Sequence, residues 1–279
     1  MFSFSRLTWQ WSITAEVFSL NNLFVGLLMA LSVQFKEATT AKERSKICKV
    51  GAFSCGLSMC NQHTIVIYML CIVLWVSSRL FRERELTLSN ALKLSFCFLA
   101  GCLPYLYLPI SAYLNKARWT WGDQTSFKGF MTHLLREEYG TFSLAKLENG
   151  SSTIDVLLFQ VTHMKMELSL VVHVFAIVAC VCCAAKDKEV TVDLAVYINV
   201  IDILFFLCLE GKFGHFKAPV ERFWMQSNAV IVVLAGFGFS LLFFVGEIFI
   251  GNSRMIYSLE WLLAAVLVTA QIYSNYRLR

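Results

Sequence analysis

The sequence is poor in charged residues and in proline, which excludes a large water-soluble core. Of its 279 residues, 15% are charged and three are proline, whereas 57% are hydrophobic. A soluble domain usually carries roughly 25% charged residues. The net charge of +5 is small and spread over loops. Nucleic-acid binding is therefore also disfavoured, because that function needs a basic stripe on one folded face.

The sequence also lacks the motifs of several catalytic classes. It contains no metal-binding motif, no glycine-rich phosphate loop and no Ser-His-Asp arrangement, so neither a metal nor a cofactor is expected. Its ten cysteines lie in or beside apolar runs, which argues against a disulfide framework. The cluster Cys180-Val-Cys182-Cys183 has no histidine beside it and is interpreted as small buried residues rather than metal ligands.

What the sequence does contain is a series of long apolar runs. Several of them reach the ~18–20 residues that cross a bilayer as a helix. The sequence therefore predicts an all-α, polytopic helical membrane protein with about seven to eight membrane helices. The expected helices cover residues 14–35, 47–60, 63–78, 88–109, 167–185, 191–209, 228–250 and 258–274. The run 191–209 is the weakest of them, because it contains Asp193, Asn199 and Asp202.

The basic loops indicate how the chain crosses the membrane. The loops 36–49 and 79–93 are both rich in Lys and Arg, so both are expected on the cytosolic side. The apolar segment between them is interrupted at Cys60-Asn-Gln-His-Thr64. We therefore expect two short helices with Asn61 and His63 at their lumenal turn. One continuous helix through this segment is the alternative.

The next expected helix delivers a long loop to the lumenal side. It ends in Leu103-Pro-Tyr-Leu-Tyr-Leu-Pro109, where the two prolines favour a kink and a helix end. Residues 110–153 would then lie in the lumen. Asn149-Gly-Ser151 in this loop is an N-glycosylation sequon, which is usable only on that side.

The loop contains the longest polar interval of the chain, Trp119 to Tyr139. Its apolar residues recur at the spacing of one helix face: Phe127, Phe130, Met131, Leu134 and Leu135. This pattern predicts an amphipathic helix on the membrane surface that begins after Thr125 or Ser126 and ends at Gly140. The helix would either simply cover the bundle or form the wall of a lumenal site.

In the second interpretation, the interval supplies binding residues. Trp119 and Trp121 would stack on a sugar or a lipid headgroup, and Asp123 would accept hydroxyl hydrogen bonds or serve as a cap. Arg136 would hold a phosphate, because its planar fork matches phosphate oxygens. Tyr139 completes this group of candidates.

Other lumenal segments place polar residues at the same depth. Glu16 lies at the lumenal end of the first expected helix, where a carboxylate usually faces the bundle interior or a water-filled cavity. Asn61 and His63 lie at the helix-pair turn, and Arg222 comes from the loop 210–227. A base that activates a hydroxyl nucleophile should be a lumenal carboxylate. Glu16 is only a weak candidate for this role.

Five stretches in order resemble a known family. They are Ala15–Asn21, Gly56–Thr64, Leu103–Ile110, Trp119–Gly140 and Glu221–Ser227. Together they resemble the multi-span GT-C type membrane glycosyltransferases, and within them the endoplasmic-reticulum protein O-mannosyltransferases that act on plexin-type immunoglobulin-like receptor domains. Residues 1–279 are then expected to form a partial membrane domain of this type, with a divergent segment at 186–218.

The resemblance implies a reaction and a place. Mannose would move from a dolichyl-phosphate donor to Ser or Thr of a secretory-pathway protein, in the endoplasmic-reticulum membrane. Arg222 or Arg136 would hold the donor phosphate. The resemblance also implies that the catalytic Asp belongs to a loop upstream of Met1 and that a lumenal domain follows the last helix. We therefore expect the chain to be an internal fragment or a short form that is inactive by itself.

Two other functions remain open on the residues alone. A membrane transporter is suggested by the intramembrane residues His173, Asp202 and Glu247, although no sequence repeat is visible. A non-catalytic regulatory membrane protein is the other alternative.

Overall fold

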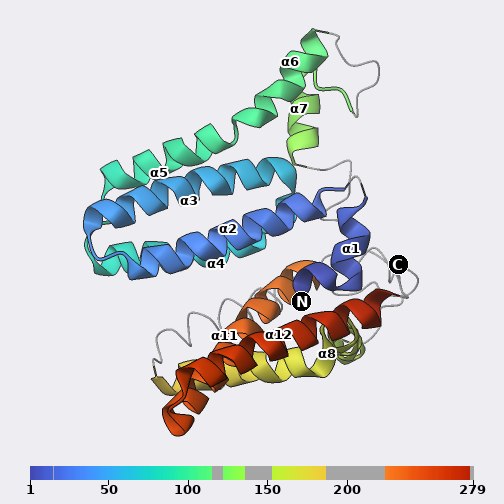
Figure 1. The fold of residues 1–279 in the computed structure, drawn as a ribbon. Coiled ribbons are helices and arrows are strands. Elements are labelled where there is room, and N and C mark those ends of the chain that lie inside the picture. The colour runs from blue at the N-terminus through green and yellow to red at the C-terminus, as the bar shows by residue number, and fades with distance from the viewer. Residues whose placement is uncertain (15, 115–121, 136–152, 187–223, 277–279) are drawn as a thin grey trace. The chain divides into compact units, whose positions relative to one another are not determined.

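The computed structural model describes residues 1–14, 16–114, 122–135, 153–186 and 224–276. These residues form helices and no strands, which confirms the all-α fold class. The chain divides into two compact units (Figure 1). The first contains Met1–Asn22 and the described residues beyond 150, and the second runs from Leu23 through the described residues up to 135.

The second unit is built from hairpins of membrane helices. Its elements are α2 (Phe18–Glu37, whose first turn belongs to the first unit), α3 (Ala41–Asn61), η2 (His63–Ile65), α4 (Val66–Arg82), α5 (Leu88–Gly101), η3 (Leu103–Leu106), α6 (Tyr107–Tyr113) and α7 (Phe127–Leu134). A capping box between Thr40 and Glu43 starts α3. Helix α5 and the segment 103–113 form a pair bent by 46°, as the prolines predict.

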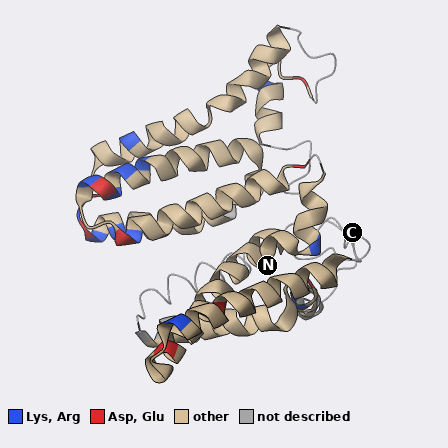
Figure 2. Cartoon of the chain, viewed as in Figure 1, with Lys and Arg blue, Asp and Glu red and all other residues tan. Residues whose placement is uncertain are grey.

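The predicted break between α3 and α4 is confirmed. Gln62 has an extended backbone (φ −151°, ψ 125°) that ends α3, so the alternative of one continuous helix is wrong. Arg44, at the start of α3, donates from Nε to Glu85 Oε2 at 3.2 Å, in the loop after α4. The two basic loops therefore lie at the same end of this unit, and Figure 2 shows its Lys and Arg gathered there.

Helices α3 and α5 touch through their backbones. A Cβ added at Gly56 would lie 2.0 Å from the carbonyl oxygen of Phe98, and one at Gly101 would lie 2.2 Å from that of Phe53. Only glycine fits such a contact. In lipid, where apolar burial hardly drives helix association, small residues of this kind allow the close packing that holds helices together.

The first unit joins the N-terminal segment to three long helices. Its elements are η1 (Phe2–Phe4), α1 (Arg6–Ser12), α8 (Thr153–Lys186), α11 (Trp224–Ile250) and α12 (Ser253–Tyr276). Helix α8 is longer than the predicted 167–185 and is broken at Ser169, whose φ of 65° and ψ of 157° are not helical. Gly238 on α11 packs against α8, since a Cβ there would lie 1.9 Å from the carbonyl oxygen of Phe175.

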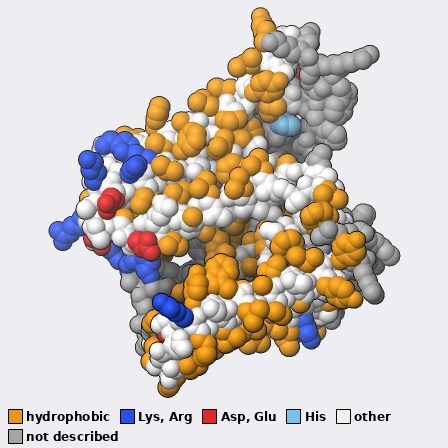
Figure 3. Space-filling model, viewed as in Figure 1, with side chains coloured by type: hydrophobic (Ala, Val, Ile, Leu, Met, Phe, Trp, Pro, Cys, Tyr) orange, Lys and Arg blue, Asp and Glu red, His pale blue; other side chains and the backbone are white. Residues whose placement is uncertain are grey.

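The described helices agree with a multi-pass membrane protein. Five of them are long and apolar enough to cross a membrane, or six if the bent pair counts as one span. Figure 3 shows hydrophobic side chains along the helices of both units. The predicted total of seven to eight membrane helices stays a prediction, because residues 191–209 lie outside the described residues.

The contact at Gly238 can be tested with a matched pair. Gly238→Ala is expected to lower the free energy of unfolding of the detergent-purified protein by about 1–3 kcal/mol, and with it the melting temperature, because the new methyl group overlaps the α8 backbone. Gly236→Ala, on the same helix with no atom within 4 Å of its would-be Cβ, is expected to be neutral or slightly stabilising. Equal melting temperatures for the two variants would contradict this packing.

Candidate functional site

A buried charged cluster ties the N-terminal segment to α8 in the first unit. Glu167 is only 3% exposed, and its carboxylate accepts from Arg6 Nε at 2.9 Å and from the backbone N–H of Leu7 at 3.1 Å. These partners lie about 160 residues away in sequence. Both carboxylate oxygens are occupied, so Glu167 is suited to hold the segment rather than to take a proton from a substrate.

His163 lies one helical turn before Glu167 and completes this cluster. Its Nε2 is 3.0 Å from an Nη of Arg6. A guanidinium group only donates, so Nε2 accepts and the ring proton of the neutral imidazole lies on Nδ1. The ring also packs edge-on against Trp224 with 4.9 Å between centroids. Arg6 therefore fixes both the carboxylate and the imidazole.

The break in α8 directly follows the cluster. Ser169 adopts a left-handed φ, which is unfavourable for a residue other than glycine and is often found at functional sites. Gln271 on α12 donates to the backbone carbonyl of Glu167 at 2.6 Å, and His173 Nδ1 lies 2.8 Å from the carbonyl of Ser169. These bonds satisfy backbone groups around the break and place α12 beside it.

Three buried amides lie near the start of α11 and of α2. Asn21 and Asn228 are 0% exposed and Gln226 is 1% exposed. Both polar atoms of each Asn, and Nε2 of Gln226, have no hydrogen-bond partner in the described part of the chain. An unpaired buried group costs about 1–3 kcal/mol. The two helices meet here, because Met225 packs against Phe18.

These amides belong to two of the stretches that carry the family resemblance. Asn21 ends the first stretch, and Gln226 lies in the last one. Sequence reasoning missed these residues, together with Glu167 and His163. An available signal was the presence of amides at the ends of apolar runs, where unpaired polar groups are expensive.

In the second unit, two further stretches meet. His63 Nε2 lies 2.6 Å from the hydroxyl of Tyr105, and this hydroxyl is 2.7 Å from the backbone carbonyl of Met59. Since the hydroxyl donates to the carbonyl, His63 donates to the hydroxyl and carries its proton on Nε2. Asn61 is the last residue of α3 and lies beside this turn. His63 thus has a positioning role between the α3–α4 turn and η3.

Asp123 lies in the turn before α7 and is not the residue that caps the helix. Its predicted role of accepting hydrogen bonds from a ligand stays a prediction. Its carboxylate accepts from the backbone N–H of Thr125 at 3.0 Å and from the Thr125 hydroxyl, and these bonds lower the pKa of Asp123. Ser126 caps the helix by accepting from the N–H of Gly129 at 3.1 Å. The helix ends at Leu134 and not at the predicted Gly140, with Leu135 as its C-cap.

The other predicted site residues are placed as follows. Glu16 is exposed in the turn before α2 and not inside a helix, because α2 begins at Phe18. It belongs to the first unit, whereas Asn61, His63 and Asp123 belong to the second. Trp119, Trp121, Arg136, Tyr139, Asn149 and Arg222 lie outside the described residues.

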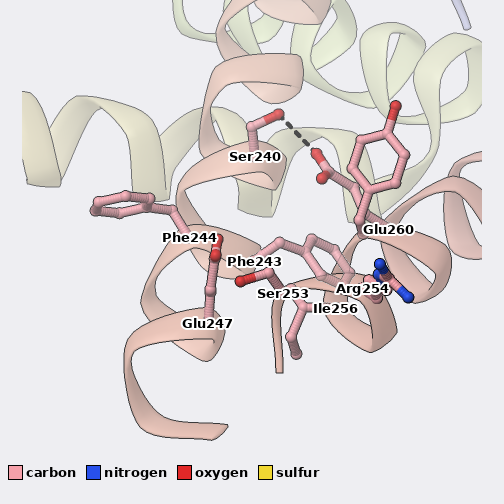
Figure 4. A pocket seen from close by; sticks show the side chains of 9 residues that line it. Ser240, Phe243, Phe244, Glu247, Ser253, Arg254, Ile256 and Glu260 are labelled. Atoms are coloured by element: carbon pink, nitrogen blue, oxygen red, sulfur yellow. Dashed lines mark hydrogen bonds between the residues drawn. The ribbon is translucent and has the colours of Figure 1, made fainter. Parts of the chain in front are cut away.

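A separate pocket of about 630 Å³ lies between α11 and α12 at their connecting turn (Figure 4). Glu247, Arg254 and Glu260 line it, and Ser240 donates to Glu260 at 3.0 Å. It lies at the opposite end of α11 from Trp224 and the buried cluster. In the described ranges, no group of three His, Cys, Asp or Glu residues is arranged to hold a metal ion.

Comparisons with known proteins place the chain beside one group of enzymes. The family model described as the protein O-mannosyl-transferase TMEM260 N-terminal domain matches residues 1–87. The mouse protein O-mannosyl-transferase TMEM260 is 57% identical over 286 residues, which cover 99% of this chain and 40% of the relative. The Dictyostelium discoideum protein O-mannosyl-transferase tmem260 is 31% identical over 262 residues, which cover 87% of this chain and 32% of the relative. The chain thus spans less than half the length of either relative, and no solved structure matches it.

The buried ion pair predicts a large loss of stability on neutralisation. Glu167→Gln is expected to lower the free energy of unfolding by about 3 kcal/mol. The glutamine amide is uncharged and has only one accepting oxygen, so either Arg6 or the Leu7 N–H loses its acceptor. Glu260→Gln is the matched control and should change it by less than about 0.5 kcal/mol. Unfolding in detergent measures both, and equal values would contradict the role of Glu167.

The hydrogen bonds of Asp123 to Thr125 predict a pH-dependent turn before α7. Because the folded pKa of Asp123 is lowered, its stabilisation is present above the unfolded value of about 3.9 and is lost as pH falls through the folded value. Hydrogen exchange at Thr125, whose N–H donates to Asp123, should therefore accelerate below about pH 4 once corrected for intrinsic rates. Asp123→Asn should remove this pH dependence, and a wild-type protein without it would contradict the role of Asp123 in the turn.

Proposed function

The chain is related over nearly its whole length to the TMEM260 protein O-mannosyl-transferases, and we propose that it forms the membrane part of such an enzyme. The reaction is the transfer of mannose from dolichyl phosphate mannose to Ser or Thr of secretory-pathway receptor domains, in the endoplasmic-reticulum membrane. The observation that carries the proposal is the identity to the mouse relative along the chain. A transporter or a regulatory protein is not favoured by this relationship.

The arrangement of the motifs supports the proposal. In the first unit, the stretch ending at Asn21 meets the stretch containing Gln226, and both lie beside the Arg6–Glu167 cluster. In the second unit, the stretch around His63 meets the one around Tyr105. Each unit thus brings two distant motifs together at its predicted lumenal end.

The buried amides are the groups that we assign to the donor. Asn21, Gln226 and Asn228 offer both donors and acceptors, which suit the hydroxyl groups of a sugar and the oxygens of its phosphate. Buried away from water, such hydrogen bonds are strong, and leaving them unmade is costly. A polar ligand would supply the partners that the described part of the chain does not provide.

The cluster of Arg6, His163 and Glu167 then has a supporting task. Acceptor attack on the mannose C1 breaks its bond to the phosphate oxygen, and a carboxylate base takes the acceptor hydroxyl proton. Glu167 is held by two donors and keeps the N-terminal segment in place. Glu16, exposed in the turn before α2, is the weak candidate for this base that the sequence named.

The amides can be tested by separating stability from activity. Asn21→Leu and Asn228→Leu remove unpaired buried amides with nearly the same shape, so they should maintain or raise the melting temperature of the donor-free protein. The same variants are expected to lower kcat/KM by roughly tenfold or more in transfer from dolichyl phosphate mannose to a purified receptor domain. The assay uses membranes containing the complete protein.

Gln34→Leu is the matched control, because Gln34 is an exposed amide on α2. Gln34→Leu should leave both the melting temperature and kcat/KM unchanged. Full activity in both Asn variants would contradict the assigned donor contacts. Absence of any transfer by the unsubstituted protein, with donor and acceptor saturating, would contradict the proposed reaction itself.

A further inference from the structure

An apolar cavity of about 490 Å³ lies among α2, α3, α4 and α5, within the second unit. Each helix contributes large apolar side chains to its wall, among them Phe35, Ile72 and Phe98. Its volume is in the range of ligand sites, roughly 300–1,000 Å³. Protein interiors have few voids larger than a water molecule. A cavity of this size and polarity is therefore suited to a hydrocarbon occupant.

The cavity arises where the glycine contacts end. Gly56 and Gly101 bring the α3 and α5 backbones together, but Gly51, five residues earlier on α3, has no atom within 4 Å of its would-be Cβ. Gly51 lines the cavity. A Cβ at Gly51 would therefore enter open space, so the absence of a side chain there leaves part of the cavity unfilled.

The depth of the cavity matches one leaflet of a bilayer. Along α4 it extends from Met69 to Leu80, which is about 16 Å at 1.5 Å per residue. The hydrocarbon core of a membrane is roughly 30 Å thick, so half of it is about 15 Å. The wall also includes Val73 and Leu99, which are 48% and 62% exposed, so the cavity is reachable from the side of the unit.

A small polar notch adjoins the cavity at its basic end. The notch has a volume of about 60 Å³ and shares Cys48, Leu80 and Leu94 with the cavity wall. Lys49 and Lys93 line it from α3 and α5.

The charges around the notch favour an anion. Lys49 and Lys93 form no hydrogen bond or ion pair within the residues that the structure describes. Glu85, the carboxylate in the notch, is neutralised by its ion pair with Arg44. Lys and Arg gather at this end of the unit in Figures 2 and 3.

We propose that the second unit binds an anionic phospholipid, with one acyl chain in the cavity and the phosphate between Lys49 and Lys93. Basic sites between membrane helices on the cytosolic side suit anionic headgroups, and the basic loops assign this end to the cytosol. The site is made of residues of the second unit, whereas the donor contacts proposed above belong to the first unit, so the proposal is independent of that function. The lipid fills the gap between the helices and stabilises the unit.

The test compares lipids retained by the purified protein in native mass spectrometry. Nanodiscs contain equal amounts of phosphatidylserine and phosphatidylcholine with identical chains. Wild-type protein is expected to retain phosphatidylserine preferentially. Lys49→Gln combined with Lys93→Gln should reduce this preference by roughly 10- to 30-fold, because each lysine that attracts an anionic headgroup raises the affinity by roughly three- to fivefold.

A second variant tests the cavity separately. Gly51→Leu places a side chain in open space inside the cavity, so it should fold normally and lose retention of both lipids. Matched controls are Lys42→Gln, on the same helix outside the notch, and Gly26→Leu, which has open space but does not line the cavity. Both should behave as wild type, and melting temperatures confirm that all variants are folded.

Three outcomes would overturn the proposal. The first is equal retention of the two lipids by the wild type. The second is unchanged retention in both the double-lysine and the Gly51→Leu variants. The third is displacement of phosphatidylserine by dolichyl phosphate at equal concentration, which would assign the cavity to the donor lipid instead.

Discussion

Close backbone contact at glycine is the constraint on which both units depend. Helices in lipid gain little from burying apolar side chains against each other, so they associate where small residues let their backbones approach. Gly56 with Gly101, and Gly238 with the Phe175 carbonyl, are such points. Gly51, by contrast, has no atom within 4 Å of its would-be Cβ and lines the 490 Å³ cavity in the second unit.

The buried polar residues of the first unit divide into those with hydrogen-bond partners and those without partners in the described part of the chain. The carboxylate of Glu167 has partners on both oxygens, and Arg6 orients His163 as well, so this cluster is a structural anchor. Asn21 and Asn228 have none in the described part of the chain, although they are equally buried. Such unpaired groups are retained at a cost in stability, which is the physical reason to assign them to a ligand rather than to the fold.

The second unit has different chemistry at its two ends. One end holds the bonded pair of His63 and Tyr105, which belong to two of the stretches that carry the family resemblance. The other carries the basic loops and the notch between Lys49 and Lys93. A phospholipid bound at the basic end would occupy the space among the helices without contacting the His63–Tyr105 pair, because neither residue lines the cavity or the notch.

The sequence alone determined the properties that depend on neighbouring residues. Run length and loop charge predicted the helices, the break at Gln62 and the shared side of the two basic loops, because hydropathy and the positive-inside rule act locally. The apolar spacing predicted α7, although the helix ends at Leu134 and not at Gly140. Only the tertiary structure decided that Glu167 meets Arg6 and that Asn21 lies near the helix carrying Gln226. Such contacts depend on how each helix is rotated about its axis and on partners 160 or more residues away. No local pattern encodes these two quantities.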